Sequence, residues 1–377
     1  MDLKIYRLAW LLAGLCSIAF PLNAQSDTGR LSKILDYYFG EAESDKPRFL
    51  AYPTLAYSPE TKWELGLSSL YVFHAGRDTA SRLSEVNAFA FVTQEQQKGL
   101  WLDHAIYGPQ NAWFSLGRVR IMDYPLHYYG VGYSPAEQPL ALVQGRTVSV
   151  RERWLKQIKT HRYVGLELDV QSFGNVHFDW EPHAHGFLPP LGHQGALNVG
   201  LGLGWVHDSR PNVLNARSGG LAELAFLHYN HRMGSEFPMN TLFFDVRKFW
   251  TLRPQQVLAL HGAAQLSAGH IPFTQLSMIG GESIMRGHYL GRLRDKQMLA
   301  LQAEWRWLPF SWSQRLGGAL FASCGSVSED WPFAVWHGSA GGGLRYLLFP
   351  EKDVYTRVDI GFHRAGYGLY FYIGEAF

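Results

Sequence analysis

Residues 353–363 have the sequence DVYTRVDIGFH, in which apolar side chains alternate with mostly polar ones. In an extended chain, successive side chains point to opposite faces. One face would therefore carry Val354, Thr356, Val358, Ile360 and Phe362. The opposite face would carry Asp353, Tyr355, Arg357, Asp359 and His363. The segment is predicted to be a β-strand with one apolar face and one charged face.

The same alternation recurs elsewhere in the chain. In 163–171, an apolar set alternates with Tyr163, Glu167, Asp169 and Gln171. In 242–250, a second apolar set alternates with Asp245 and Arg247. A strand of a soluble sandwich would also alternate, but a packed core holds so many charges only at high cost, whereas a water-containing lumen accommodates them. The repeated pattern predicts an all-β protein, a transmembrane antiparallel β-barrel.

About sixteen such segments follow one another along the chain, an even number that suits a single-chain bacterial barrel. Their predicted spans are 48–58, 61–74, 83–94, 99–107, 111–119, 144–157, 161–175, 195–208, 217–230, 239–251, 255–268, 296–308, 314–327, 338–349, 353–363 and 367–377. The long predicted connections are 120–143, 176–194, 269–295 and 328–337. If the chain enters the barrel from the periplasm, these connections face outward.

Composition agrees with a membrane barrel and argues against other classes. Aromatic residues make up 15% of the chain and charged residues only 18%, below the quarter that is usual in soluble proteins. Beyond the N-terminus, no stretch is apolar for long enough to form a membrane-spanning helix. The net charge of +2 argues against a nucleic-acid partner.

The N-terminal residues predict export and divide the chain into three parts. Lys4 and Arg7 precede an apolar run, and Ala24 provides a small residue before a cleavage site, so residues 1–24 are predicted to be a signal peptide. Cys324 would then be the single cysteine of the mature chain, which leaves no internal disulfide. Residues 25–47 are predicted to be a periplasmic linker with one amphipathic helix at 31–39, followed by the barrel at 48–377.

The C-terminus resembles the assembly signal of outer-membrane barrels. Phe371 and the terminal Phe377 are predicted to share the apolar face of a last strand, 367–377, with Glu375 as the single polar interruption. A strand that ends in an aromatic residue is typical of these barrels.

Residues 280–289, GGESIMRGHY, lie in the connection between the eleventh and twelfth predicted strands. Here the chain resembles the outer-membrane protein 85 superfamily, which includes BamA/TamA-like surface antigens and two-partner secretion transporters. In that family a loop with an Arg-Gly-aromatic tip folds back into the lumen. The resemblance implies that Arg286, Gly287 and Tyr289 form this tip, and His288 departs from the pattern by preceding the aromatic residue.

Further motifs follow the family's order. Asp208, Arg210 and Gly219 resemble its turn between the eighth and ninth strands, and Glu304 resembles its inward acidic residue on the strand after the loop. Residues 318–325 resemble its thirteenth strand, with Ser323 where family members often have an aspartate. The resemblance is strong over 195–377, whereas the first half matches only around 128–132.

Strand alternation agrees with this comparison. If Trp305 and Trp307 face lipid, Glu304 faces the lumen, and on the next strand Phe321 and Ser323 do so too. An inward Arg286 could then contact Glu304, its main expected partner, while Phe321 packs against the loop tip. A buried guanidinium needs such an anionic partner.

The resemblance implies assistance in inserting or moving proteins or lipids at the outer membrane. Relatives usually carry periplasmic polypeptide-transport-associated domains, for which residues 25–47 leave no room, so we expect a short form of the family. The alternatives are a passive pore and a structural, partner-bound barrel; an outer-membrane lipase or protease is a further alternative, although no nucleophile elbow is present.

Expected partners are outer-membrane lipids and lipopolysaccharide, and an outer-membrane protein or a second copy contacting the barrel wall or helix 31–39. No cofactor motif is present. The connection 176–194 carries His177, His183, His185 and His193, which could hold a divalent metal, but its prolines favour an ordinary surface loop and no metal is expected.

Overall fold

The computed structural model describes residues 48–74, 81–82, 84–184, 186–213, 215–350 and 353–377. The predicted signal peptide and the predicted helix 31–39 lie outside the described residues. Within the described part, no helix is long and apolar enough to cross a membrane.

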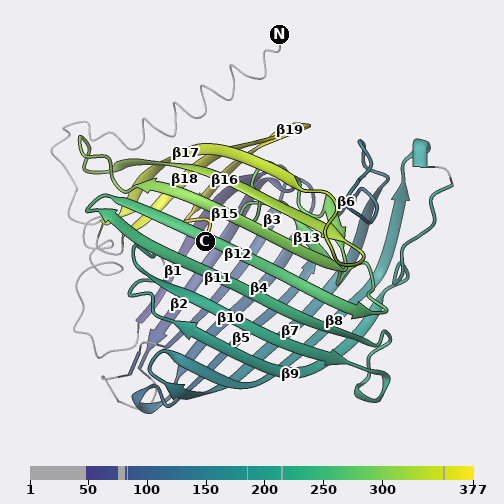
Figure 1. The fold of residues 1–377 in the computed structure, drawn as a ribbon, viewed down its shortest axis with the longest axis horizontal. Helices are drawn as coiled ribbons and strands as arrows, with labels where there is room; N and C mark the ends of the chain where they lie inside the picture. The colour runs from purple at the N-terminus through teal and green to yellow at the C-terminus, as the bar shows by residue number, and fades with distance from the viewer. Residues whose placement is uncertain (1–47, 75–80, 83, 185, 214, 351–352) are drawn as a thin grey trace, which may run out of the picture. The chain divides into compact units, whose positions relative to one another are not determined.

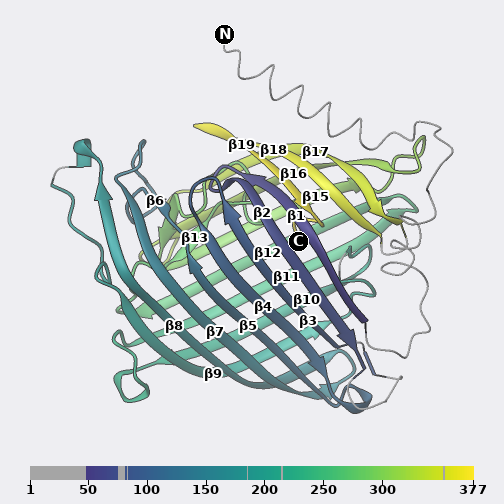
Figure 2. The same cartoon turned by 180° about the vertical axis from the view of Figure 1, so that it is seen from behind.

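The described chain forms a closed antiparallel barrel of 16 strands, as predicted. Figures 1 and 2 show the strands running obliquely around the wall. The wall strands are β1 (Arg48–Ser58), β2 (Lys62–Phe73), β3 (Ser84–Thr93), β4 (Lys98–Tyr107), β5 (Trp113–Asp123), β7 (Ala141–Lys159), β8 (Arg162–Trp180), β9 (Ala196–Asp208), β10 (Gly219–Tyr229), β11 (Met239–Arg253), β12 (Gln256–Gly269), β15 (Gln297–Trp307), β16 (Leu316–Ser328), β17 (His337–Phe349), β18 (Val354–His363) and β19 (Gly366–Ile373).

Three short strands lie outside this set and were not predicted. β6 (Leu126–Tyr128) extends the wall beside β7, while β13 (Ser277–Ile279) and β14 (Leu293–Asp295) pair with each other. Both β7 and β8 are longer than predicted, because their pairing continues beyond the wall into the connection regions. The long connections, 124–140, 181–195, 270–296 and 329–336, share one end of the barrel, called the loop end below.

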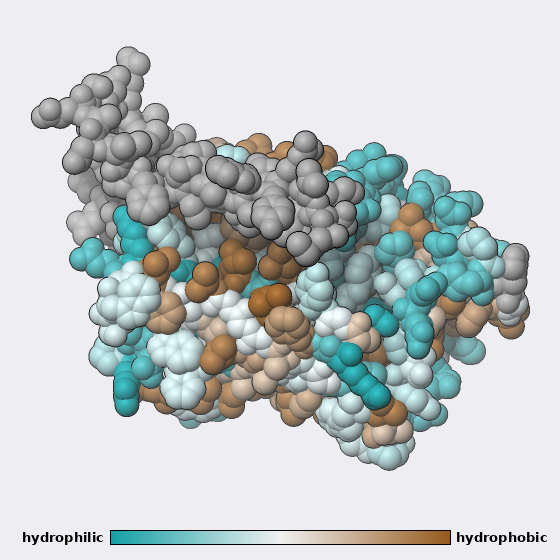
Figure 3. All heavy atoms as spheres, turned by 90° about the horizontal axis from the view of Figure 1, so that it is seen from above, coloured by the Kyte–Doolittle hydropathy of each residue, from teal (hydrophilic) through white to brown (hydrophobic). Residues whose placement is uncertain are grey.

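Side chains alternate between the lumen and the outer face, as the sequence predicted. On β15, Glu304 and Arg306 are fully buried, whereas Leu301 and Trp305 are 48% and 43% exposed on the outer face. Figure 3 shows hydrophobic residues across the strand wall and hydrophilic residues gathered toward the loop end, at the right. This arrangement suits a wall in lipid and a loop end in water.

The barrel closes through a short seam between its first and last strands. In the described residues, β1 and β19 are in register at one pair, Tyr57 with Phe371. By contrast, β1 pairs with β2 along its whole length, from Arg48 with Val72 to Ser58 with Lys62. Since ladder hydrogen bonds hold neighbouring strands together, this seam is the weakest joint in the wall.

The C-terminal prediction was wrong for the last four residues. β19 ends at Ile373, and Gly374 turns the chain with a φ of 96° while its N–H donates to the Tyr355 carbonyl at 2.7 Å. Phe377 then packs inside the barrel against Phe249, Val257 and Ala259. Strand alternation cannot foresee this turn, because the acceptors and charges that hold the tail belong to distant strands.

Candidate functional site

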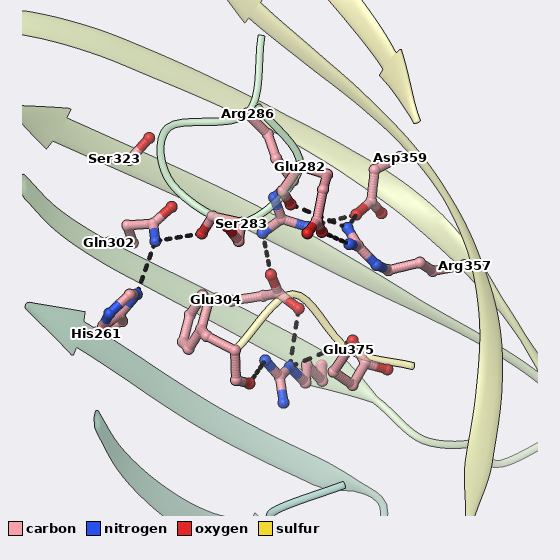
Figure 4. Close-up of polar contacts among 12 residues, drawn as sticks. His261, Glu282, Ser283, Arg286, Gln302, Glu304, Ser323, Arg357, Asp359 and Glu375 are labelled. Carbon is pink, nitrogen blue, oxygen red and sulfur yellow. Dashed lines mark hydrogen bonds and ion pairs between the residues drawn. The ribbon is translucent and has the colours of Figure 1, made fainter. Parts of the chain in front are cut away.

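The connection 270–296 returns to the barrel wall from the inside. Its apolar residues Ile279, Met285 and Leu293 are buried against Met298, Ala300 and Val327 of β15 and β16. This packing places the segment 282–287 beside the charged inner faces of β15 and β18, as Figure 4 shows. The hydrophobic contacts therefore bring Arg286 into an environment without bulk water.

Arg286 lies at the centre of this site. Its guanidinium donates to the carboxylates of Glu304 on β15 and Asp359 on β18, and its Cζ lies 3.6 Å from the ring centroid of Phe321 on β16. All three charged side chains are at most 1% exposed. A buried guanidinium held by two carboxylates and an aromatic face joins the loop to three strands.

Three further arginines surround the two carboxylates. Glu304 also accepts from Arg306 Nε at 2.8 Å and from Arg345 Nη2 at 3.2 Å. Asp359 also accepts from Arg345 Nη1 at 2.5 Å and from Arg357 Nη1 at 2.9 Å.

Two more carboxylates complete a balanced ion network. Glu375 of the C-terminal tail accepts from Arg345 Nε at 3.0 Å, and Glu282 of the loop pairs with Arg357. The ion network thus contains four arginines and four carboxylates: Arg286, Arg306, Arg345, Arg357, Glu282, Glu304, Asp359 and Glu375. Equal numbers of opposite charges make burial tolerable, since each ion has a partner.

The C-terminal tail belongs to the same site. Arg306 Nη2 donates to the carbonyl of Phe377 at 2.9 Å, and the Arg306 guanidinium lies 5.2 Å from the Phe377 ring centroid. The tail therefore supplies one carboxylate, one carbonyl and one aromatic face to the arginines that also bind Glu304.

A glutamine fixes the main chain of the loop beside Arg286. The side-chain oxygen of Gln302 accepts from Met285 N at 3.0 Å, and its nitrogen donates to the Ser283 carbonyl at 2.8 Å. The same nitrogen donates to His261 Nδ1 at 2.9 Å, and His261 is held in turn by Asp245 at 3.1 Å. Charge pairing and main-chain hydrogen bonds thus hold the same short segment.

Two glycines allow the loop to touch the wall. Gly287 has a φ of 112°, a left-handed conformation that other residues adopt with strain. On β18, a Cβ built on Gly361 would lie 2.5 Å from the Arg286 carbonyl oxygen and 2.8 Å from Gly287 N. The loop backbone is in direct contact with the strand backbone, so no side chain fits between them.

Gly361→Ala is expected to displace the loop and to destabilise the protein by about 1–3 kcal/mol, because its methyl group overlaps main-chain atoms that cannot rotate away. Undocking would expose the peptide bonds after Arg286 and Arg292 to trypsin, so loop cleavage should accelerate. Gly338→Ala on β17 is the matched control, since its nearest atom would be 3.8 Å away. Equal cleavage of the two variants would contradict this contact.

The loop tip reaches both sides of the seam, at β19 and at the turn that follows β1. Gly287 N donates to the Tyr370 hydroxyl on β19 at 2.9 Å. Three residues later, Leu290 N donates to Glu60 Oε1 in the turn between β1 and β2, at 2.7 Å. The loop therefore connects the two sides of the seam from inside, where direct pairing of β1 with β19 is short.

The other predicted residues have different surroundings. Tyr289 does not contact Arg286 but packs near His127 and Tyr129, with ring centroids 5.8 Å apart in each pair. The Ser323 hydroxyl bonds to that of Ser339 at 2.6 Å. In Figure 4, Ser323 lies apart from the charged cluster. A serine has no carboxylate with which to pair with Arg286.

The predicted turn motif lies at the opposite end from the long connections. Asp208 accepts from Arg210 Nε at 3.0 Å, and Gly219 adopts a φ of 82° where a Cβ would lie 2.3 Å from the Ser209 oxygen. Phe371 lies on β19 at the seam. These residues shape the wall and are not part of the ion network.

His288 gives the loop tip a titratable group. Its ring is stacked on His363 with centroids 4.2 Å apart and lies 6.2 Å from His337, and Arg292 is also close enough to act on it. Burial, reinforced by the neighbouring histidine, lowers the pKa of His288 to about 4.

Folding stability should therefore fall as the pH drops from 6.5 towards 4, because the unfolded chain binds a proton at His288 that the folded chain does not bind. The pKa difference predicts a loss of about 2–3 kcal/mol at pH 4. His288→Gln should reduce the difference between the unfolding free energies measured with denaturant at pH 7.5 and pH 4 by that amount. Identical pH dependence in the wild type and the variant would show that His288 has no such role.

The histidine-rich connection forms no metal site in the described residues. His177 and His193 line a cavity of about 300 Å³ with Phe178 and Trp180. No three His, Cys, Asp or Glu residues of the described chain stand close enough to hold a metal ion. His185 lies outside the described residues.

Comparisons with known proteins agree on one barrel type. The sequence profile of the Omp85 superfamily domain matches residues 176–375. BamA from Haemophilus ducreyi, lacking POTRA domains 1–3, superposes with a TM-score of 0.58 at 12% identity, covering 86% of this chain and 70% of that one.

Two CdiB structures give similar results. CdiB from Acinetobacter baumannii has a TM-score of 0.57 at 11% identity, covering 95% of this chain and 70% of that one. CdiB from Escherichia coli has a TM-score of 0.54 at 12% identity, covering 86% of this chain and 62% of that one. No curated protein matches at a significant level.

Proposed function

Because the chain belongs to the Omp85 superfamily, we propose that it assists the insertion or movement of proteins or lipids at the bacterial outer membrane. The barrel is of the type found in that membrane. One observation carries the proposal: the tip of the 270–296 loop contacts β19 on one side of a short seam and the β1–β2 turn on the other.

The chemistry of a seam supports this role. Unpaired main-chain groups at a strand edge can pair with a strand of another protein, and exposing them to lipid is otherwise unfavourable. In the proposed mechanism, the seam between β1 and β19 separates and offers its edges to an incoming chain or perturbs the adjacent lipid. The loop stabilises the barrel while this happens, because its contacts do not depend on pairing between β1 and β19.

The ion network has a defined part in the mechanism. Arg286 joins the loop to β15 and β18, while Gly287 reaches β19. The strands near the C-terminal side of the seam therefore stay attached to the loop, and the β1–β2 turn is attached separately through Glu60. Separation of the seam would need to break the Glu60 contact and the short strand pairing.

Depletion of the protein, followed by quantification of the outer-membrane proteins and lipids, tests the proposal. We expect the abundance or distribution of a defined set of these components to change and to be restored by the wild-type gene. Unchanged abundance and distribution of these proteins and lipids would contradict the proposal. A large, steady single-channel current from the purified barrel would instead favour the passive pore.

A further inference from the structure

One buried arginine in the loop has no carboxylate partner among the residues that the structure describes. The described chain buries seven arginines: Arg153, Arg210, Arg286, Arg294, Arg306, Arg345 and Arg357. Six of them form ion pairs with aspartate or glutamate. Arg294 of β14, which is 5% exposed, forms none with any residue that the structure describes. Since an unpaired buried charge is costly, Arg294 differs in kind from the other six.

Among the described residues, the Arg294 side chain makes one hydrogen bond and one aromatic contact. Its Nε donates to the Gly291 carbonyl at 3.1 Å, and its guanidinium lies 5.5 Å from the ring centroid of Tyr128. Burial lowers the pKa of Arg294 to about 10, so the side chain still carries its charge at neutral pH. An arginine has five N–H donors in a planar fork that matches carboxylates and phosphates.

A cavity of about 260 Å³ lies beside this guanidinium, between the loop and the inner wall formed by β5 to β9. Its apolar side is aromatic: Phe273 packs edge-on against Tyr128 and Phe173, with ring centroids 6.2 Å and 5.8 Å apart. Its polar side carries Ser149 and Gln171 from the wall and Thr274 from the loop. Aromatic walls with a few polar groups and one charge are typical of small-molecule sites.

We propose that this cavity binds a small organic anion, whose carboxylate or phosphate pairs with Arg294 and whose apolar part packs against Tyr128, Phe173 and Phe273. Such a ligand would supply the negative charge that the described residues do not. The volume limits the ligand to a single ring or a short chain. A bound anion would also join the loop to the wall on the side opposite the ion network.

Binding can be measured on the full-length barrel in detergent, with benzoate and phenyl phosphate as probes and benzamide as the uncharged control. We expect either anion to bind the wild type, and the tighter one identifies the preferred head group. Benzamide, which has the same ring without the charge, should bind at least about tenfold more weakly, because hydrogen bonds to charged groups are the stronger kind.

Two variants remove different parts of the site. Arg294→Met retains bulk but removes the charge, and Ser149→Phe retains the charge but fills the cavity from the opposite wall. Arg292→Met is the matched control, because Arg292 lies in the same loop, is partly exposed and does not line the cavity. The first two variants should lose anion binding by at least about tenfold and the control should retain it.

Three results would overturn the proposal. They are a wild type that binds neither anion, benzamide binding as tight as that of benzoate, and anion binding that Arg294→Met and Ser149→Phe leave unchanged. If Arg294→Met does not fold, Ser149→Phe still decides, since it leaves the guanidinium in place.

Discussion

Glu304→Ala is expected to destabilise the barrel by about 3–5 kcal/mol, the usual penalty for removing one member of a buried ion pair. Glu304 accepts from Arg286, Arg306 and Arg345, and all four side chains are at most 1% exposed. Without Glu304, three guanidinium groups share Asp359 and Glu375. The uncompensated positive charge should release the loop and lower the denaturant concentration at which the barrel unfolds.

The comparison with other variants makes this prediction specific. Arg286→Met should lower the unfolding free energy by less than Glu304→Ala does, because both carboxylates keep partners. Glu304 stays paired with Arg306 and Arg345, and Asp359 stays paired with Arg345 and Arg357. Glu329→Ala is the control, since Glu329 is 70% exposed in its pair with Lys296 and such pairs contribute about 0–1 kcal/mol. A Glu304→Ala barrel as stable as the Glu329→Ala barrel would refute the importance of the ion network.

Closing the seam covalently should abolish the proposed activity. Tyr57→Cys combined with Phe371→Cys places two thiols at the position where β1 and β19 are in register. The exposed Cys324 is replaced by serine to prevent other disulfides. When the disulfide forms, the strands cannot separate, and complementation of the depleted strain should fail until a reductant is added.

The matched control carries a disulfide between strands that should not separate. Leu320→Cys with Gly342→Cys joins β16 to β17 at residues that are also in register. We expect this variant to complement under both oxidising and reducing conditions. Full activity of the oxidised Tyr57–Phe371 variant would show that seam opening is not required.

Strand alternation was sufficient to predict the wall. Charged positions such as Asp245, Glu304 and Asp359 alternate with lipid-facing residues, and a one-residue shift would place all of them in lipid. The number of strands and the direction in which Glu304 points therefore followed from local sequence. Strand ends did not follow from alternation, as β8 shows, because its pairing with β7 continues into the connection regions.

The site itself was only partly predictable. The resemblance singled out Arg286 and Glu304, whose contact the structure contains, but Asp359 as the second partner was missed. Asp359 could have been predicted, because it lies on the charged, inward face of the strand 353–363. Since position 323 is a serine and not an aspartate, Arg286 needed a second carboxylate from another strand. The inward tail gave no local signal, because Glu375 and Phe377 are held by Arg345 and Arg306 from other strands.

The most direct test is the energetic coupling between Arg286 and Glu304, measured by unfolding the wild type, Arg286→Met, Glu304→Gln and the double variant under one condition. If the loop is held by this contact, the two substitutions should be non-additive by at least about 1 kcal/mol, with the double variant less impaired than the sum predicts. If the losses of unfolding free energy in the two single variants add up to that of the double variant within about 0.3 kcal/mol, the account is contradicted.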